Sequence, residues 1–448
     1  MTRRQFVGLL AGAPIPLAAA PGSQSSLAIT NATVIDGTGA VLADHTVLVA
    51  NGRIAKLGQF TPPKDALVID GRRKFLIPGL WDMHAHLSYM KDSALPLLLA
   101  NGVTSIRDMG GRLSEIDIWR AGIDGGWRPG PRIVRAGPIV NGKRFNEFQI
   151  DVTTAAEARG AVRALQHAGV DFIKVHAAIS SDAYSGIRDE CKALKLPFAG
   201  HIPRAVTPEE VSDGGQITIE HISAIGERFA RAGTPPDEVA HALLDFRKTK
   251  APALFEKFAK NGTWFTPTLI ASQTGMHLGR HKPDSRDRYI AQSCKKITAD
   301  IMQRPDYREM TLPPAIERMK REFDELLPLV RLMKDSGVGL LTGSDFAISL
   351  IYPGFSVHEE MALLVDAGLT AAEAIATATR NPARMLGRGD IGTIEPGKLA
   401  DMVLLDKDPL ADIRNTQSIR AVITRGKLLD RTALDQLLKR AESEASES

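Results

Sequence analysis

Between residues 77 and 388 the chain repeats one unit: a short apolar run, a polar or glycine-containing turn, and an amphipathic stretch with helical spacing. Apolar runs that alternate with helical stretches predict parallel strands joined by crossover helices. Eight such runs end at His84/His86 or span 103–108, 132–137, 172–176, 197–201, 217–221, 264–269 and 339–345. Eight units over this length predict an α/β protein with a (β/α)8 TIM barrel.

The two ends of the chain carry a different pattern. Residues 27–58 consist of short β-branched runs separated by Asp-Gly, Gly and Asn-Gly turns, which is typical of antiparallel strands joined as hairpins. A similar pattern returns within 392–429. We therefore expect the two ends to pair into one small β-sandwich domain. The predicted small β domain comprises residues 23–76 and 389–431, and the barrel comprises residues 77–388. Residues 432–448 are predicted to be a frayed polar tail.

Residues 1–22 predict an export signal. Arg3 and Arg4 precede an apolar stretch of small residues that ends in an Ala-Ala-Ala cleavage site. The segment 2–7 resembles a twin-arginine motif, which implies export of the folded protein and a periplasmic or secreted location. Two prolines interrupt the apolar stretch, which is too short to span a bilayer, so we expect no stable membrane anchor.

Without this signal the chain is almost neutral. The 448 residues have a formal net charge of +4, and loss of the two arginines at positions 3 and 4 leaves +2. Binding to many phosphates needs concentrated positive charge, so we expect no nucleic-acid partner. Cys191 and Cys294 lie far apart in helix-like segments, and we expect two buried reduced thiols rather than a disulfide.

Ionisable residues end five of the eight apolar runs. His84 and His86 stand two apart at the end of the first run, and alternate side chains of a strand share one face. Imidazole is a common ligand of zinc-like ions, so this pair indicates a metal site. The carboxyl ends of barrel strands converge on the face that carries chemistry, so we expect later strand-end residues to join the pair. These residues are Lys174, His201, His221 and Asp345.

In this order the motifs resemble the amidohydrolase superfamily of metal-dependent hydrolases. The resemblance covers nearly the whole mature chain and rests on PGLWDMHAHL, FIKVHA, AGH, IEH, LLTGSD and IEPGKLADMVLLD. It favours the branch of imidazolonepropionase-like proteins and Xaa-Pro dipeptidases. A binuclear metal site follows from this resemblance. The implied ligands are His84, His86 and Asp345 for the inner metal, His201 and His221 for the outer metal, and Lys174 as an N6-carboxylysine between them.

The implied chemistry explains these residue types. A lysine amine that has reacted with carbon dioxide is an anionic carbamate, which two nearby cations stabilise. In the implied reaction a hydroxide shared by the two metals attacks the amide carbon, and Asp345 acts as general base and then as general acid. We expect two divalent ions, with zinc as first choice, although manganese, cobalt and iron also accept this donor set.

Other residues near the strand ends are candidates for substrate binding. Arginine suits bidentate binding of a carboxylate, and tyrosine or histidine can donate a hydrogen bond to an oxyanion. The candidates are Arg107, Tyr89, His176 and Arg204, with Asp108, Asn141, Lys143 and Arg144 as neighbours. We expect three further histidines to be solvated loop or helix residues: His277, His281 and His358.

The sequence thus predicts an exported hydrolase that cleaves an amide bond, with a dipeptide or an N-acyl amino acid carrying a free carboxylate as the expected substrate. A lactone, urea, carbamate or cyclic-amide hydrolase is the alternative within the enzyme class. If Lys174 is an ordinary salt-bridging lysine, the site is mononuclear and an imidazolone-type reaction is favoured. The alternative outside the enzyme class is a metal- or ligand-binding barrel without turnover. From the same resemblance we expect a homo-oligomer.

Overall fold

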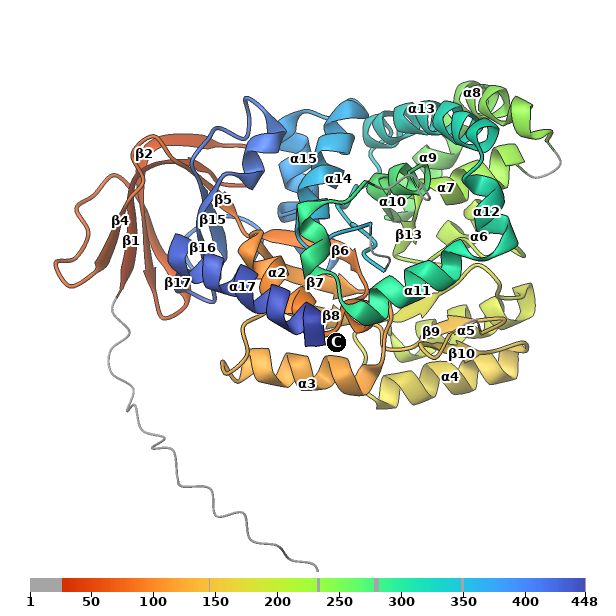
Figure 1. Ribbon diagram of the computed structural model, residues 1–448, viewed down its shortest axis with the longest axis horizontal. Coiled ribbons are helices and arrows are strands. Elements are labelled where there is room, and N and C mark those ends of the chain that lie inside the picture. The colour runs from red at the N-terminus through yellow and green to blue at the C-terminus, as the bar shows by residue number, and fades with distance from the viewer. Residues whose placement is uncertain (1–25, 145, 232–233, 278–281, 348–349, 448) are drawn as a thin grey trace, which may run out of the picture.

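A computed structural model describes residues 26–144, 146–231, 234–277, 282–347 and 350–447. The predicted export signal lies outside these residues and stays a prediction. Figure 1 shows a sheet-rich region at one end and a larger body in which strands and helices alternate. Among the helices of the described ranges, none has the length and apolarity that a membrane crossing needs.

The sheet-rich region is one hydrogen-bonded sheet of eight strands from both ends of the chain, in the order β17-β16-β15-β5-β1-β2-β3 with β4 paired to β1. Antiparallel pairing of Met402 with Pro78 joins the C-terminal strands to the N-terminal ones. All eight strands therefore belong to one sheet, and the predicted β-sandwich is not confirmed. The strands are β1 (Leu27–Ile35), β2 (Val41–Ala50), β3 (Arg53–Gly58), β4 (Leu67–Asp70), β5 (Phe75–Pro78), β15 (Met402–Leu405), β16 (Ile419–Thr424) and β17 (Lys427–Leu429).

The larger body contains two parallel sheets, β6-β7-β8 and β10-β9-β11-β12-β13-β14. Each of the seven predicted runs before residue 339 contains one of these strands, and two short strands that were not predicted, β9 and β10, follow the third run. These strands are buried because helices cover the sheets, as parallel sheets require. The bounds are β6 (Leu80–Ala85), β7 (Val103–Asp108), β8 (Arg132–Arg135), β9 (Ile139–Asn141), β10 (Gln149–Asp151), β11 (Ile173–Val175), β12 (Phe198–Gly200), β13 (Thr218–Glu220) and β14 (Trp264–Thr266).

The eighth predicted run forms isolated bridges rather than a ladder. Leu340 bridges Phe265 and Phe346 bridges Ala85, both in parallel, so residues 340–346 lie between β14 and β6. Gly343 explains the close approach, because a Cβ atom there would lie 2.7 Å from the Cβ of His84. The strand arrangement is barrel-like, but no continuous ladder around the barrel is found among the described strands.

Helices follow most strands and bury an apolar stripe against the sheets. In α4, for example, Thr154 and Glu157 form a capping box, and the stripe Ala158, Val162 and Leu165 is buried. The helices are α1 (Leu87–Met90), α2 (Ala94–Ala100), α3 (Leu113–Asp124), α4 (Ala155–His167), α5 (Ser181–Leu194), α6 (Pro208–Asp213), α7 (Ile222–Gly226), α8 (Val239–Thr249), α9 (Ala251–Asn261), α10 (Leu269–Gly275), α11 (Gln292–Met302), α12 (Pro305–Met310), α13 (Pro313–Asp335), α14 (Phe355–Asp366), α15 (Ala371–Thr377), α16 (Arg380–Met385) and α17 (Arg431–Glu447).

The predicted frayed tail at 432–448 is wrong, because nearly all of it belongs to α17. Leu434, Leu437, Ala441 and Ala445 recur at helical spacing and are buried. This stripe packs on α2, and Figure 1 shows α17 in blue crossing the orange helix. The polar composition of the segment belongs to the opposite, solvated face.

Candidate metal centre and active site

The predicted ligand residues lie at one end of the parallel strands. His84 is the next-to-last residue of β6 and His86 directly follows that strand, while Lys174 is in β11. His201 directly follows β12, and His221 directly follows β13. Asp345 lies near the end of the bridged segment 340–346. The structure therefore gathers residues that are up to 261 positions apart in sequence, because parallel strands present their carboxyl ends on one face.

Four imidazoles form a row at this face. Ring centroids are 5.3 Å apart for His86 and His84, 4.7 Å for His84 and His221, and 4.6 Å for His221 and His201. The carboxylate of Asp345 faces the row: Oδ1 lies 3.4 Å from Nε2 of both His84 and His86. Ligand atoms of His84, His221 and Asp345 all lie within 4.8 Å of one another, as a shared metal ion requires.

Each of three histidines is oriented through its Nδ1 atom. His84 Nδ1 lies 2.9 Å from Oε2 of Glu220, and His86 Nδ1 donates to the carbonyl of Gly110 at 2.8 Å. His221 Nδ1 lies 2.8 Å from Oγ1 of Thr268. Such contacts fix the tautomer, so that Nε2 is the free ligand atom of His84 and His86.

Glu220 belongs to a buried ionic network below the row. Arg107 donates from Nη2 to Glu220 Oε1 at 2.8 Å, from Nε to the Met83 carbonyl at 2.7 Å, and from Nη1 to Thr218 at 2.9 Å. Arg107 is 1% exposed. The prediction that it binds substrate is therefore wrong, because its donors are committed to the carboxylate and carbonyl that hold the first strand in place.

The backbone of two ligand residues is in the left-handed region. His221 has φ 70° and Asp345 has φ 60°, a conformation that costs of order 1–3 kcal/mol for a side chain other than glycine. Hydrogen bonds hold Asp345 there, since its N–H donates to the His84 carbonyl at 2.7 Å. Asp82 adds a second link, accepting from the N–H groups of both His84 and Ser344.

Protonation states at the site favour ligand binding. Burial lowers the pKa of His84 and His201, and the charge of Lys174 adds to the effect, so both imidazoles are neutral at pH 7. Burial alone would raise the pKa of Asp345, but the surrounding histidines outweigh it and lower that pKa, so the carboxylate is ionised. Burial also lowers the pKa of Lys174 to about 8.

Several buried nitrogen atoms at the site make no hydrogen bond. Within the described part of the chain, no hydrogen bond is made by Lys174 Nζ, His84 Nε2 or His201 Nδ1. Buried polar atoms are rarely left unsatisfied, and each costs about 1–3 kcal/mol. Burial also lowers the pKa of His221, whereas Asp345 outweighs burial at His86 and raises its pKa. Three imidazoles of lowered pKa, a fourth paired with an ionised carboxylate, and an amine of lowered pKa fit divalent cations and a carboxylated lysine.

The remaining candidates divide into two groups. Tyr89 and His176 extend the site: the Tyr89 ring lies edge-on to His86 at 5.7 Å, and His176 lies 4.2 Å from His201. Arg204 is exposed in the loop after His201.

Asp108 and Asn141 are buried and have structural roles, the first accepting from the Leu87 N–H and the second from the Ala178 N–H. Lys143 and Arg144 are exposed.

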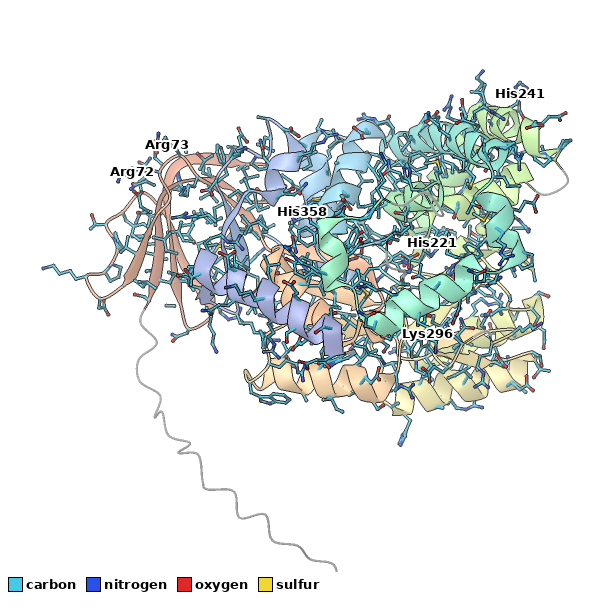
Figure 2. All side chains as sticks on the ribbon, in the orientation of Figure 1. Arg72, Arg73, His221, His241, Lys296 and His358 are labelled. Atoms are coloured by element: carbon cyan, nitrogen blue, oxygen red, sulfur yellow. The ribbon has the colours of Figure 1, made fainter. Side chains whose placement is uncertain are left out.

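One histidine prediction is wrong. His358 is fully buried in α14, where Nδ1 lies 2.9 Å from Thr416 Oγ1 and Nε2 donates to the Asn101 carbonyl at 3.0 Å. Figure 2 labels both His358 and His221. His277 is exposed as expected, and His281 lies outside the described residues. Cys191 and Cys294 are free and buried, as expected.

Sequence comparison decides the family. The pattern that describes the amidohydrolase family matches residues 75–429, which is most of the chain. The chain belongs to the amidohydrolase family. It is an enzyme of the class that hydrolyses carbon–nitrogen bonds.

Its similarity to individual proteins extends over almost the full length. It is 24% identical to a dihydroorotase from Pelotomaculum thermopropionicum over 90% of this chain and 95% of that protein. Identity is also 24% to an imidazolonepropionase from Salinispora arenicola, over 84% and 90% of the two chains.

Among solved structures, the chain is similar to a bottromycin amidohydrolase, with a TM-score of 0.76, 24% identity and coverage of 94% and 91%. It is also similar to a Xaa-Pro dipeptidase, with a TM-score of 0.67, 20% identity and coverage of 91% and 100%. These similarities support a TIM-barrel-like α/β fold.

The contact between Glu220 and His84 generates a prediction. Glu220→Gln removes the charge that orients His84 and balances Arg107, so zinc affinity of the metal-free protein should fall roughly ten- to hundredfold. Glu238→Gln, at an exposed position remote from the strands, is the matched control and should bind zinc as the wild type does. Isothermal titration calorimetry measures both, and equal affinity of Glu220→Gln and wild type would refute the orienting role.

Proposed function

We propose that this amidohydrolase holds two divalent metal ions, zinc being the first choice, and cleaves an amide bond in a dipeptide or N-acyl amino acid with a free carboxylate. The observation that carries the binuclear site is the buried Nζ of Lys174, which makes no hydrogen bond among the described residues and lies at the same strand ends as the histidine row. Carboxylation would convert this amine into an anionic bridge. His84, His86 and Asp345 would hold one ion, and His201 and His221 the other.

The reaction adds water across the carbon–nitrogen bond. The water oxygen bonds to the carbonyl carbon, the bond to nitrogen breaks, and one water proton ends on the leaving amine. When bound, the two ions would supply Lewis acidity and lower the pKa of the attacking water. Asp345 is the proton carrier: its ionised carboxylate accepts the proton and returns it to the amine.

The mouth of the site offers groups for the two ends of such a substrate. Tyr89 and His176 flank the histidine row and can donate to the carbonyl oxygen as it becomes negative. Arg204 is an exposed cation at the mouth of the site. The pKa of His176 is lowered mainly by burial, and the charge of Arg204 is one of several that lower it further. With Arg107 committed to Glu220, we assign Arg204 to the substrate carboxylate.

A cyclic-amide hydrolase is the second candidate. The similarity to imidazolonepropionase over 84% of this chain favours it. Such a substrate lacks a free α-carboxylate next to the scissile bond, so Arg204 would then contribute little. The Xaa-Pro dipeptidase similarity supports the first candidate.

Lys174→Ala should abolish the bridge between the two ions. The wild-type protein, loaded with zinc in bicarbonate buffer, should contain two ions per chain, and the variant one, with a large loss of turnover. Small carboxylates should restore part of the activity because they can replace the bridging anion. Metal analysis and turnover measure these outcomes; one ion in the wild type together with full activity of Lys174→Ala would exclude the binuclear site.

Substrate class and proton transfer can be tested on one panel. Xaa-Pro dipeptides and N-acyl amino acids should be cleaved, and their C-terminal amides should be poor substrates with a raised KM. Arg204→Gln should raise KM for the acids but not for the amides. Asp345→Asn should keep the fold and lower kcat by roughly a thousandfold. Preferential cleavage of cyclic amides would instead support the second candidate, and full activity of Asp345→Asn would refute its role.

We also propose export through the twin-arginine signal of residues 1–22. Replacement of both Arg3 and Arg4 by lysine keeps the charge but removes the guanidinium pair. The variant should accumulate inside the cell as full-length enzyme, whereas the wild type should be recovered from the periplasm or medium. Fractionation with activity assays measures this, and unchanged export of the Lys-Lys variant would contradict the proposal.

A further inference from the structure

A large cavity lies at the end of the strands opposite the metal centre. Its volume is about 610 Å³, which is within the usual range for small-molecule sites. Its lining includes Trp264, the first residue of β14, and Leu340, which begins the segment that leads to Asp345. Residues 35–41 of the small sheet close its other side. The cavity is therefore separate from the histidine row and lies at the junction of the two regions.

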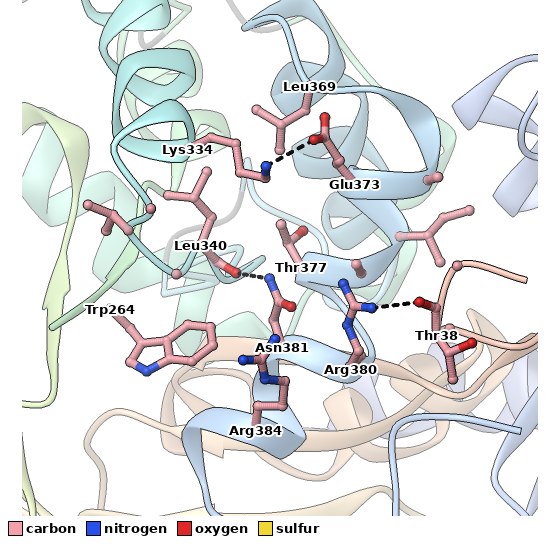
Figure 3. Close-up of a pocket in the computed structure, with 18 of the residues that line it drawn as sticks. Thr38, Trp264, Lys334, Leu340, Leu369, Glu373, Thr377, Arg380, Asn381 and Arg384 are labelled. Carbon is pink, nitrogen blue, oxygen red and sulfur yellow. Dashed lines mark hydrogen bonds and ion pairs between the residues drawn. The ribbon is translucent and has the colours of Figure 1, made fainter. Parts of the chain in front are cut away.

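The walls combine an apolar surface with excess positive charge. Ile35, Val41, Val338, Leu340 and Leu369 line the cavity with the Trp264 indole, while its charged residues are Lys334, Arg380, Arg384 and Glu373. In Figure 3 Arg384 is drawn close to Trp264, and Arg380 is further away, beside Thr38.

The single carboxylate of the cavity is already committed. Glu373 lies 3.0 Å from Lys334 Nζ and also closes the capping box of α15 with Thr370. This leaves the charges of Arg380 and Arg384 without a partner in the cavity. Arg380 donates from Nη1 to the Thr38 carbonyl at 2.9 Å. Among the described residues, neither arginine has an ion-pair partner.

A second cavity shows that arginines at this end of the barrel are not generally unpaired. It has a volume of about 440 Å³ and is lined by several arginines. Besides Arg107, which is paired with Glu220, this cavity has four arginines, and each is paired with an aspartate. The pairs are Arg120 with Asp171, Arg132 with Asp401, Arg388 with Asp390, and Arg425 with Asp124. The unpaired arginines are thus a property of the first cavity.

Trp264 is held flat against the cavity wall by its neighbour. A Cβ atom at Gly339 would lie 2.1 Å from Cε3 of the indole, so only glycine allows the ring to lie in this place. An aromatic ring and two guanidinium groups in one cavity suit a ligand with a flat apolar body and one oxyanion.

We propose that this cavity is a second binding site, for a small organic oxyanion, carboxylate or phosphate, with an aromatic or branched apolar body. The oxyanion would accept hydrogen bonds from Arg384 and from the free Nη2 of Arg380, and the apolar body would lie on Trp264. The ligand would contact both the small sheet and the barrel, so its binding should also raise the melting temperature of the enzyme.

The test titrates the metal-loaded enzyme with phenylacetate and phenyl phosphate, with neutral phenylacetamide and inorganic phosphate as comparison probes. At least one aromatic anion should bind and quench tryptophan fluorescence, and each comparison probe should bind roughly tenfold or more weakly. Binding by phenylacetate alone or by phenyl phosphate alone decides which oxyanion is preferred. Failure of both to bind at millimolar concentration would overturn the proposal.

Two variants localise the binding. Arg384→Gln, at an exposed position, should weaken it roughly tenfold, and Trp264→Phe should lose the quenching. The matched control is Arg388→Gln, which removes an arginine of the second cavity and should bind as the wild type does. Anion binding that is unchanged in Arg384→Gln would place the probe elsewhere, including at the metal centre, and would overturn the proposal.

Discussion

The ion pair between Arg107 and Glu220 is the contact on which the candidate site depends. Both side chains are fully buried, and a buried charge that loses its partner costs about 3–5 kcal/mol. Glu220 uses one oxygen for Arg107 and the other for His84. The pair therefore fixes β6, which carries His84, relative to β13, which carries Glu220. A neutral core would pack as well but would leave His84 free to rotate. The chain retains charge in its interior at the point where a ligand needs an orientation.

The metal-ligand candidates could be predicted because their signal is local. Each stands at the end of a short apolar run, and parallel strands bring such ends together without any knowledge of side-chain contacts. His84, His201, His221 and Asp345 were identified in this way, and the structure gathers them. Their roles as metal ligands remain predictions that metal analysis will test.

Two of the predictions that failed depended on a distant partner. Arg107 resembles a substrate-binding arginine until Glu220, 113 positions later, occupies its guanidinium. His358 has no motif, and its partners Asn101 and Thr416 are distant in sequence. The tail at 432–448 was judged by composition, although the spacing of Leu434, Leu437 and Ala441 carried the helical signal. The role of Glu220 could not be predicted either, because its partners His84 and Arg107 come near it only in the fold.

The small sheet is part of the machinery that positions the site, because its strand β5 runs into β6 with only Gly79 between them. The Gly79 N–H donates to the Asp401 carbonyl at 2.8 Å, and the Asp401 carboxylate binds Arg132 at the start of β8. A shift of the C-terminal strands would therefore move the start of β6 at Leu80, and His84 lies four residues further along that strand. Both ends of the chain must pair correctly before the first ligand is in place. This explains why residues so far from the chemistry are built into one sheet, and why a ligand at the junction of sheet and barrel would act on the same framework.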